Sequence, residues 1–245
     1  MAEGLLLVHA FPLDARMWEP QLSAFGQAMP VAAPHLPGFG GSPAAGGVMT
    51  MAAAAERCLE ELDRAGLDRV VVCGLSMGGY VALELWRRAP GIFAGLVLAN
   101  TRSGADTEEG AAGRRALAAR LRSEGSEFLA ESPPPLLSEG ASAVVRALVR
   151  GLIADQSAEA IAAAALGMAE RPDSTGDLAG IGVPALVITS DADTLIPAEV
   201  SSPMASEIPG ATLAIIERAG HLSNLEAPEE FNRVVEEHVE RCGLL

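Results

Sequence analysis

Short runs of apolar residues alternate with longer amphipathic stretches along most of the chain. The longer stretches have helical periodicity, and Gly66 and Pro90 are placed to end two of the predicted helices. Continuous apolar strands separated by helices indicate a parallel sheet that is covered on both faces. We therefore predict an α/β fold with a mainly parallel sheet of about six strands. The apolar runs lie at residues 5–10, 30–38, 69–74, 94–101, 184–191 and 211–217.

One interval, from residue 102 to residue 181, contains no credible strand. Four helical patterns fill it instead, at residues 106–125, 125–131, 141–155 and 157–170. This interval is longer than a normal crossover between two strands, which predicts a helical cap subdomain at 102–181 inserted into a core made of 1–101 and 182–245. Apolar residues at helical spacing, such as Leu117, must be buried. They either pack among themselves or cover the strand ends.

Composition limits the class of protein. The chain has 245 residues, of which 49% are hydrophobic and 20% charged, enough for one packed domain with a subdomain. The net charge of −15 argues against nucleic acid or an anionic membrane as partner. Cys58, Cys73 and Cys242 show no paired or metal-ligand spacing, and the first residues contain no basic leader. We therefore expect reduced thiols and a cytoplasmic protein.

Ser76 lies at the junction of a predicted strand and a predicted helix. Residues 74–78, Gly-Leu-Ser-Met-Gly, fit the pattern G-x-S-x-G, in which small residues allow a sharp turn that projects the serine hydroxyl. In an open parallel sheet, ligands bind beyond the carboxyl ends of the strands. The alternative is a serine that only caps the helix. The strand-turn-helix setting favours a catalytic nucleophile.

A serine nucleophile needs a histidine base. His221 follows the last strand, on a loop before a new helix, which is a suitable place for a base. His9 and His35 follow the first two strands but come early in the sequence. His238 lies in an amphipathic C-terminal pattern, for which a solvated helix face is the better interpretation. A loop histidine without a role is the alternative for His221.

The acid of such a triad is expected on a neighbouring loop. Asp191 and Asp193 both follow the fifth strand, and Asp193 gives the chain order Ser, Asp, His with a loop position that can reach His221. Asp191 is closer to the strand, where binding of turn amides is the expected role.

An oxyanion also needs hydrogen-bond donors. The N–H of Met77 at the helix start is one candidate, and the N–H of Phe11, in the loop after the first strand, is the second. An ordinary strand-to-helix loop is the alternative for Phe11.

These motifs together resemble the α/β-hydrolase superfamily, particularly its small serine carboxylesterases and 3-oxoadipate enol-lactone hydrolases. The resemblance covers the chain apart from the predicted cap. It implies Ser76, Asp193 and His221 as the triad, Phe11 and Met77 as oxyanion donors, and no cofactor. Three positions depart from the family pattern: Ala10 replaces a glycine before the oxyanion residue, His35 replaces an aspartate, and Ser190 replaces a glycine.

The leading functional hypothesis is a serine hydrolase that cleaves a small ester or lactone through an acyl-enzyme. A cofactor-free perhydrolase or haloperoxidase would use the same triad, and a ligand sensor on the same scaffold is the non-enzymatic alternative. Ser76 argues against a dehalogenase or an epoxide hydrolase, because dehalogenases and most epoxide hydrolases of this fold need an aspartate nucleophile. We expect a small-molecule substrate and make no prediction of the oligomeric state. Apolar residues near the catalytic positions, Trp18, Leu195 and Leu222 among them, are candidate substrate contacts, with plain core as the alternative.

Overall fold

Six parallel strands form the centre of the molecule, which we describe from a computed structural model covering residues 2–44 and 46–245. The sheet order is β2-β1-β3-β4-β5-β6, and each strand overlaps one of the six predicted apolar runs, extending at most two residues beyond it at either end. The predicted α/β class and strand number are confirmed. The strands are β1 (Glu3–Val8), β2 (Val31–Ala32), β3 (Arg69–Leu75), β4 (Phe93–Ala99), β5 (Ala185–Ser190) and β6 (Thr212–Ile216).

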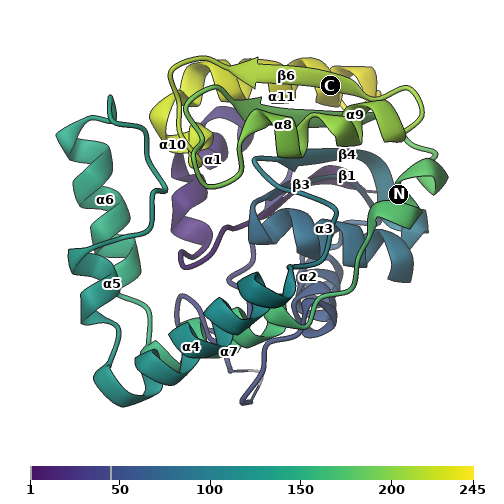
Figure 1. Cartoon of the computed structure of the whole chain (residues 1–245). Helices are drawn as coiled ribbons and strands as arrows, with labels where there is room; N and C mark the ends of the chain where they lie inside the picture. The colour runs from purple at the N-terminus through teal and green to yellow at the C-terminus, as the bar shows by residue number, and fades with distance from the viewer. Residues whose placement is uncertain (1, 45) are drawn as a thin grey trace.

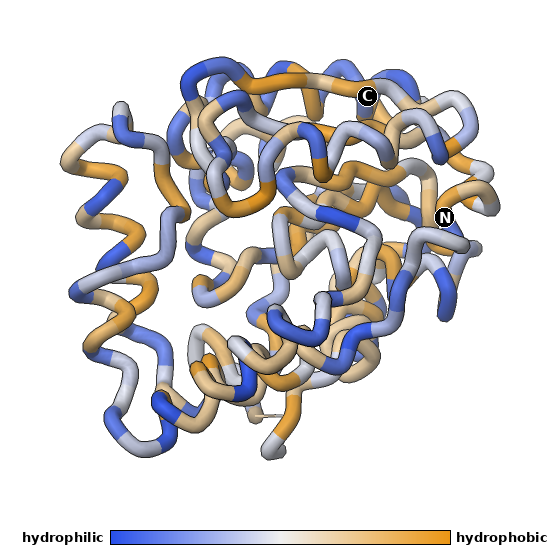
Figure 2. The backbone as a smooth tube through the Cα atoms, in the orientation of Figure 1, coloured by the Kyte–Doolittle hydropathy of each residue, from blue (hydrophilic) through white to orange (hydrophobic). Residues whose placement is uncertain are grey.

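Helices cover both faces of this sheet (Figure 1). Helices α2 and α3 pack against each other, and α3 contacts the three central strands, while α1 and α11 lie together over the opposite face. Figure 2 shows hydrophobic segments gathered in the central strands. The helices of the core are η1 (Ala15–Trp18), α1 (Glu19–Phe25), α2 (Met51–Ala65), α3 (Met77–Arg88), η2 (Pro90–Ile92), α8 (Ala198–Ser201), α9 (Pro203–Glu207), α10 (Ser223–Glu226) and α11 (Pro228–Arg241).

Helix α2 illustrates how local sequence sets these boundaries. The Thr50 hydroxyl accepts a hydrogen bond from the N–H of Ala53 at the start of the helix. Gly66 ends the helix with φ 67°, a left-handed conformation that glycine adopts without a steric cost. The predicted stop at Gly66 is therefore confirmed.

The segment 102–181, which we call the insert, contributes no strand to the sheet and joins β4 to β5. Its helices α4 and α7 pack side by side, as do α5 and α6 (Figure 1). In Figure 1 these helices lie on the side of the molecule away from the two chain termini. The elements are α4 (Glu108–Glu124), α5 (Glu127–Glu131), α6 (Ala143–Ala154), α7 (Ala158–Ala169) and η3 (Thr175–Gly180).

One prediction about the core is wrong. His238 does not lie on a solvated face of α11: it is buried, and burial lowers its pKa to about 4. Its ring approaches the sheet beneath Gly95, where a glycine leaves room for it, and its Nε2 lies 3.6 Å from Cys242 Sγ. The amphipathic pattern of α11 did not distinguish a histidine at the edge of its apolar face from one in solvent.

Within the described part of the chain, no helix has both the length and the apolar character needed to cross a membrane.

Candidate active site

Ser76 occupies a strained turn between β3 and α3. Its backbone has φ 56° and ψ −115°, a region that non-glycine residues rarely adopt and that costs about 1–3 kcal/mol. Two hydrogen bonds hold the turn: the Ser76 N–H donates to Ala99 O at 2.9 Å, and the Thr101 hydroxyl donates to Ser76 O at 2.7 Å. The Ser76 side chain makes no capping bond to α3, so its hydroxyl is not used as an ordinary helix cap.

The two glycines of the motif are needed because backbone comes very close on both sides of Ser76. A Cβ atom at Gly74 would lie 2.2 Å from Gly78 O, and one at Gly78 would lie 2.0 Å from Val8 O. No side chain fits at either distance. The start of α3 is therefore pressed against both β3 and the end of β1.

His221 and Asp193 meet in the buried region beyond β5 and β6. The Nδ1 of His221 lies 2.8 Å from Asp193 Oδ2, and both side chains are fully buried. The other ring nitrogen, Nε2, is buried and has no hydrogen-bond partner among residues 2–44 and 46–245. An imidazole held through Nδ1 with Nε2 free is the arrangement that a general base requires.

Asp193 is held as a carboxylate by several donors. Burial alone would raise its pKa, but hydrogen bonds from His221, the Ile196 N–H and Asn100 outweigh this effect, and the pKa lies below the ordinary value. Its Oδ1 accepts from the N–H groups of Leu195 and Ile196, both at 2.9 Å. The ionised form, which can orient an imidazole, is therefore the stable one.

Asn100 is a residue of this site that the sequence did not single out. It follows β4 with φ 43°, and its amide donates to both Asp193 Oδ2 at 3.0 Å and Ser190 Oγ at 2.9 Å. The Ser223 hydroxyl donates to its Oδ1 at 2.7 Å. The only indication of this role in the sequence was the position of Asn100 directly after a predicted central strand. The serine at position 190 thus has a partner that a glycine there would lack.

The other candidates take structural positions. Asp191 Oδ1 accepts from the Arg218 N–H at 2.6 Å, which is the turn-binding role expected for it. His9 is buried, and burial lowers its pKa to about 4; its Nε2 accepts from the Leu36 N–H at 3.0 Å. A neutral ring there links the loops that follow β1 and β2.

A cavity of about 210 Å³ opens beside Ser76. Seven of its lining residues come from the insert, so the insert forms more than half of the wall of this cavity. Most of the lining is apolar, and the exceptions are Ser76, Tyr80 and two arginines. The lining residues are Phe11, Ser76, Tyr80, Arg102, Arg114, Leu117, Leu129, Pro134, Leu136, Met168, Leu195 and Ile196.

The predicted substrate contacts divide into two groups. Leu195 lines the cavity and is 41% exposed. Trp18 and Leu222 are fully buried and are not part of its wall; Trp18 packs against Phe231 with ring centroids 6.0 Å apart. These two residues were predicted because they are near Phe11 and His221 in the sequence, but their side chains lie in the core and not in the cavity wall. The cavity geometry therefore does not support these two as substrate contacts.

The two predicted oxyanion donors lie at the start of α3 and in the turn after β1. Met77 is the first residue of α3, where backbone N–H groups lack partners within the helix. Phe11 lies in the turn after β1 and lines the cavity together with Ser76. Met77 precedes Gly78 at the start of α3, and Phe11 follows Val8 after the end of β1. These two segments are in close contact at Gly78 and Val8.

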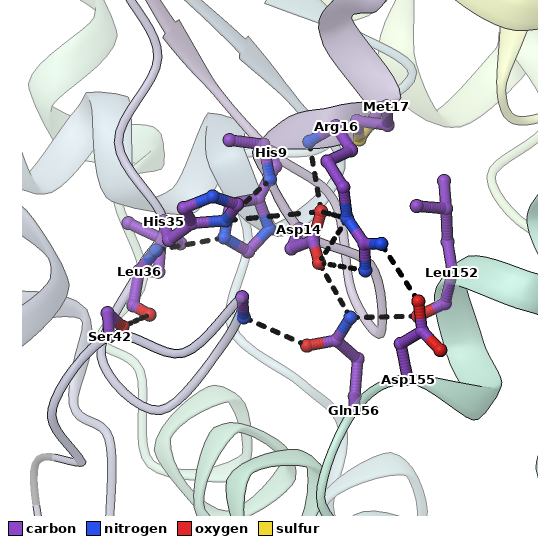
Figure 3. A network of polar contacts seen from close by, with 12 residues as sticks. His9, Asp14, Arg16, Met17, His35, Leu36, Ser42, Leu152, Asp155 and Gln156 are labelled. Carbon is purple, nitrogen blue, oxygen red and sulfur yellow. Dashed lines mark hydrogen bonds and ion pairs between the residues drawn. The ribbon is translucent and has the colours of Figure 1, made fainter.

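A buried polar network fixes the loop that carries Phe11 (Figure 3). Asp14, fully buried, accepts hydrogen bonds from the Arg16 guanidinium and from Gln156 Nε2 at 2.7 Å. Gln156, from the insert, also accepts from the Gly40 N–H at 3.1 Å. His35 lies at the edge of this network rather than in the cavity wall, and its Nδ1 accepts from the Ala15 N–H. The network joins the insert to the loops after β1 and β2.

Comparison with known proteins gives the family. The model of the alpha/beta hydrolase family matches residues 5–234. This chain belongs to the alpha/beta hydrolase family.

Several enzymes resemble this hydrolase over nearly its whole length. The pimeloyl-[acyl-carrier protein] methyl ester esterase of Aromatoleum aromaticum is 30% identical, over 96% of this chain and 97% of its own. A thermophilic esterase from Thermogutta terrifontis, solved with malate bound, is 39% identical with a TM-score of 0.95, covering 99% of this chain and 91% of its own. The enol-lactonase from Burkholderia xenovorans is 27% identical with a TM-score of 0.89, covering 98% and 92%. The expected relationship to esterases and enol-lactonases is confirmed.

The close approach at Gly78 predicts a large effect of one methyl group. Gly78→Ala should lower the free energy of unfolding of this hydrolase by about 1–3 kcal/mol or more, because the new Cβ must displace the end of β1. Urea unfolding measures the change. Gly113→Ala is the matched control: a Cβ there meets nothing within 4 Å, and the substitution should stabilise helix α4 by about 0.4–1 kcal/mol. Equal stability of the two variants would contradict this account of the turn.

The Asp14 network predicts a pH-dependent contribution to stability. Burial would raise the pKa of Asp14, but hydrogen bonds from Arg16 and Gln156 outweigh it and lower the pKa. A lowered pKa means that the contribution is present above about pH 4 and is lost as the pH falls through the folded-state value. Asp14→Asn should therefore cost about 1–3 kcal/mol at pH 7, and less in acid.

Asp155→Asn serves as the control for this variant. Asp155 binds the same arginine, but its side chain is 58% exposed, so its removal should cost less than about 1 kcal/mol. Thermal unfolding of the wild type and both variants between pH 3 and 7 checks the prediction. A loss for Asp14→Asn that stays constant over this range would be evidence against a carboxylate-based network.

Proposed function

We propose that this hydrolase cleaves small carboxylic esters or lactones through an acyl-enzyme on Ser76. His221 serves as the base, Asp193 orients it, and the N–H groups of Phe11 and Met77 bind the oxyanion. The observation that carries the proposal is the fully buried His221–Asp193 pair. It leaves His221 Nε2 without a partner among the described residues, at the strand ends where Ser76 lines a cavity.

Each half-reaction follows the same proton path. Ser76 Oγ attacks the ester carbonyl carbon and gives its proton to His221 Nε2, and the carbonyl oxygen becomes an anion that the two N–H groups stabilise. Collapse of this intermediate breaks the bond to the alkoxy oxygen, which takes the proton from Nε2. Water then attacks the acyl carbon, gives a proton to Nε2, and the acid leaves as Ser76 Oγ is protonated again.

Residues around the cavity account for selectivity toward small substrates. The walls are contributed by Leu117, Leu129 and Leu136 of the insert on one side and by Leu195 on the other. An apolar enclosure of about 210 Å³ favours a short acyl chain and restricts water at the reacting carbonyl. The enol-lactonase with 27% identity supports cyclic as well as open esters as substrates.

The nucleophile is tested with a fluorophosphonate probe and with p-nitrophenyl acetate. Wild-type protein should be labelled once, on Ser76, and Ser76→Ala should lose both labelling and turnover, the latter by a factor of about 10⁶. Ser42→Ala is a control, since the Ser42 hydroxyl donates to Leu36 O at 2.6 Å and lies outside the cavity wall. Labelling that survives in Ser76→Ala would assign the nucleophile elsewhere.

The acid is tested by comparing two aspartates of the same loop. Asp193→Asn should lower kcat by about 10⁴, because the amide favours the wrong imidazole tautomer and cannot stabilise the imidazolium. Asp191→Asn should change kcat by less than about threefold, since Asp191 binds only a backbone N–H of the neighbouring turn. Steady-state hydrolysis of p-nitrophenyl acetate gives both values. The reverse order would move the acid to Asp191.

A further inference from the structure

A cluster of three arginines and one aspartate lies beside the Ser76 cavity, and two of its arginines, Arg102 and Arg114, line the cavity. Arg171 and Asp106 are almost fully buried, and their side chains pair at 2.8 Å. Arg114, from α4, binds the second oxygen of Asp106 through its Nε. Arg102, which follows β4, completes the cluster. All 17 basic residues of the chain are arginines, and three of them share this one buried carboxylate.

Asp106 forms hydrogen bonds with two of the three arginines. Its Oδ1 binds Arg171 and its Oδ2 binds Arg114, whereas the nearest nitrogen of Arg102 is 3.8 Å away, beyond hydrogen-bond distance. Arg171 is enclosed and stacks on the Tyr80 ring at 4.1 Å. Arg102 is therefore the arginine of this cluster that lies too far from Asp106 for a hydrogen bond.

Arg102 carries a buried donor without an acceptor. Its Nε is buried and has no hydrogen-bond partner in the described parts of the chain, on either side of residue 45. Burial opposes its charge, but the neighbouring Tyr80 and Asp106 raise the pKa of the guanidinium, so it stays charged. A buried N–H that lacks an acceptor is costly unless a ligand supplies one.

Arg102 also lies at the wall of the cavity that Ser76 lines. Arg102 and Arg114 line the same cavity as Ser76, and the residue before Arg102, Thr101, donates to the carbonyl of Ser76. The other lining residues are apolar apart from Ser76 and Tyr80. An acyl chain that starts at Ser76 and runs along this wall would bring its far end to the guanidinium groups.

We propose that Arg102, with Arg114 beside it, binds a carboxylate at the far end of the acyl chain, so that the preferred substrates are monoesters of short dicarboxylic acids. This inference rests on the proposed esterase function. A guanidinium matches a carboxylate in a two-point, charge-assisted geometry, and the surrounding apolar wall strengthens such a bond. On a chain with a net charge of −15, a local excess of positive charge at the cavity also attracts an anionic substrate that the remaining surface repels.

The test compares two esters that differ only in the charge of the far end. One is the monomethyl ester of glutaric acid, and the other is the methyl ester of glutaramic acid, whose neutral amide has nearly the same shape as the carboxylate. Methanol release gives kcat/KM for each. The wild type should prefer the acid by more than about tenfold. Monomethyl succinate and adipate then show which chain length reaches the arginines.

The variant Arg102→Gln should lose this preference. Its kcat/KM for the acid should fall by about 10- to 100-fold, mainly through KM, while the value for the amide falls by a much smaller factor. Arg102→Lys should retain part of the preference, because it keeps a point charge without the paired geometry. Added glutarate should inhibit wild-type hydrolysis of p-nitrophenyl acetate more strongly than it inhibits Arg102→Gln.

A neighbouring arginine provides the matched control. Arg115 follows Arg114 on the same helix but is exposed and lies outside the cavity wall, so Arg115→Gln should keep the wild-type preference. Equal use of acid and amide by the wild type would overturn the inference and leave the esterase function standing. An equal loss on both esters in Arg102→Gln would also overturn it, because Arg102 would then be structural. Failure of the wild type to turn over p-nitrophenyl acetate would instead overturn the proposed function, and this inference with it.

Discussion

The close contact of the start of α3 with the end of β1 is the constraint on which the site depends. A side chain at Gly78 would overlap the carbonyl of Val8, so glycine at this position lets the helix sit directly on the strand. This contact fixes the backbone of Ser76 at a positive φ and brings the loop carrying Phe11 beside it. The strain at one residue is thus balanced by packing of the whole central sheet, because α3 cannot withdraw without uncovering the three strands it contacts.

Strands were predictable from the sequence because the central ones are buried on both faces and appear as unbroken apolar runs. Residues 69–75 and 93–99 are examples, and their order along the chain sets which loops meet at the carboxyl edge. Ser76, Asp193 and His221 were found for the same reason, since each follows a strand. The edge strand β6 also appears as an apolar run in the sequence, although three of its five residues are exposed in the structure.

Side-chain directions and partners were the part that the sequence did not reveal. Trp18 and His238 were assigned from their neighbours in sequence, but both side chains point into the core. Asn100 was missed because its partners, Ser190 and Asp193, lie about ninety positions away in the sequence. Arg102 was missed because Asp106, its nearest carboxylate, is bound by another arginine that comes from a distant part of the chain. No local pattern encodes such a relationship. It exists only after the insert has folded against the strand ends.

The side chain of Gln156 ties the insert to two separate loops of the sheet, since it donates to Asp14 and accepts from the N–H of Gly40. This has a consequence for protein engineering. A chimaera that takes residues 102–181 from a relative, with another residue at this position, would leave a buried carboxylate short of a donor and a loop N–H without its acceptor. Exchange of the insert therefore requires the loops around Asp14 and Gly40 to be transplanted with it as one unit.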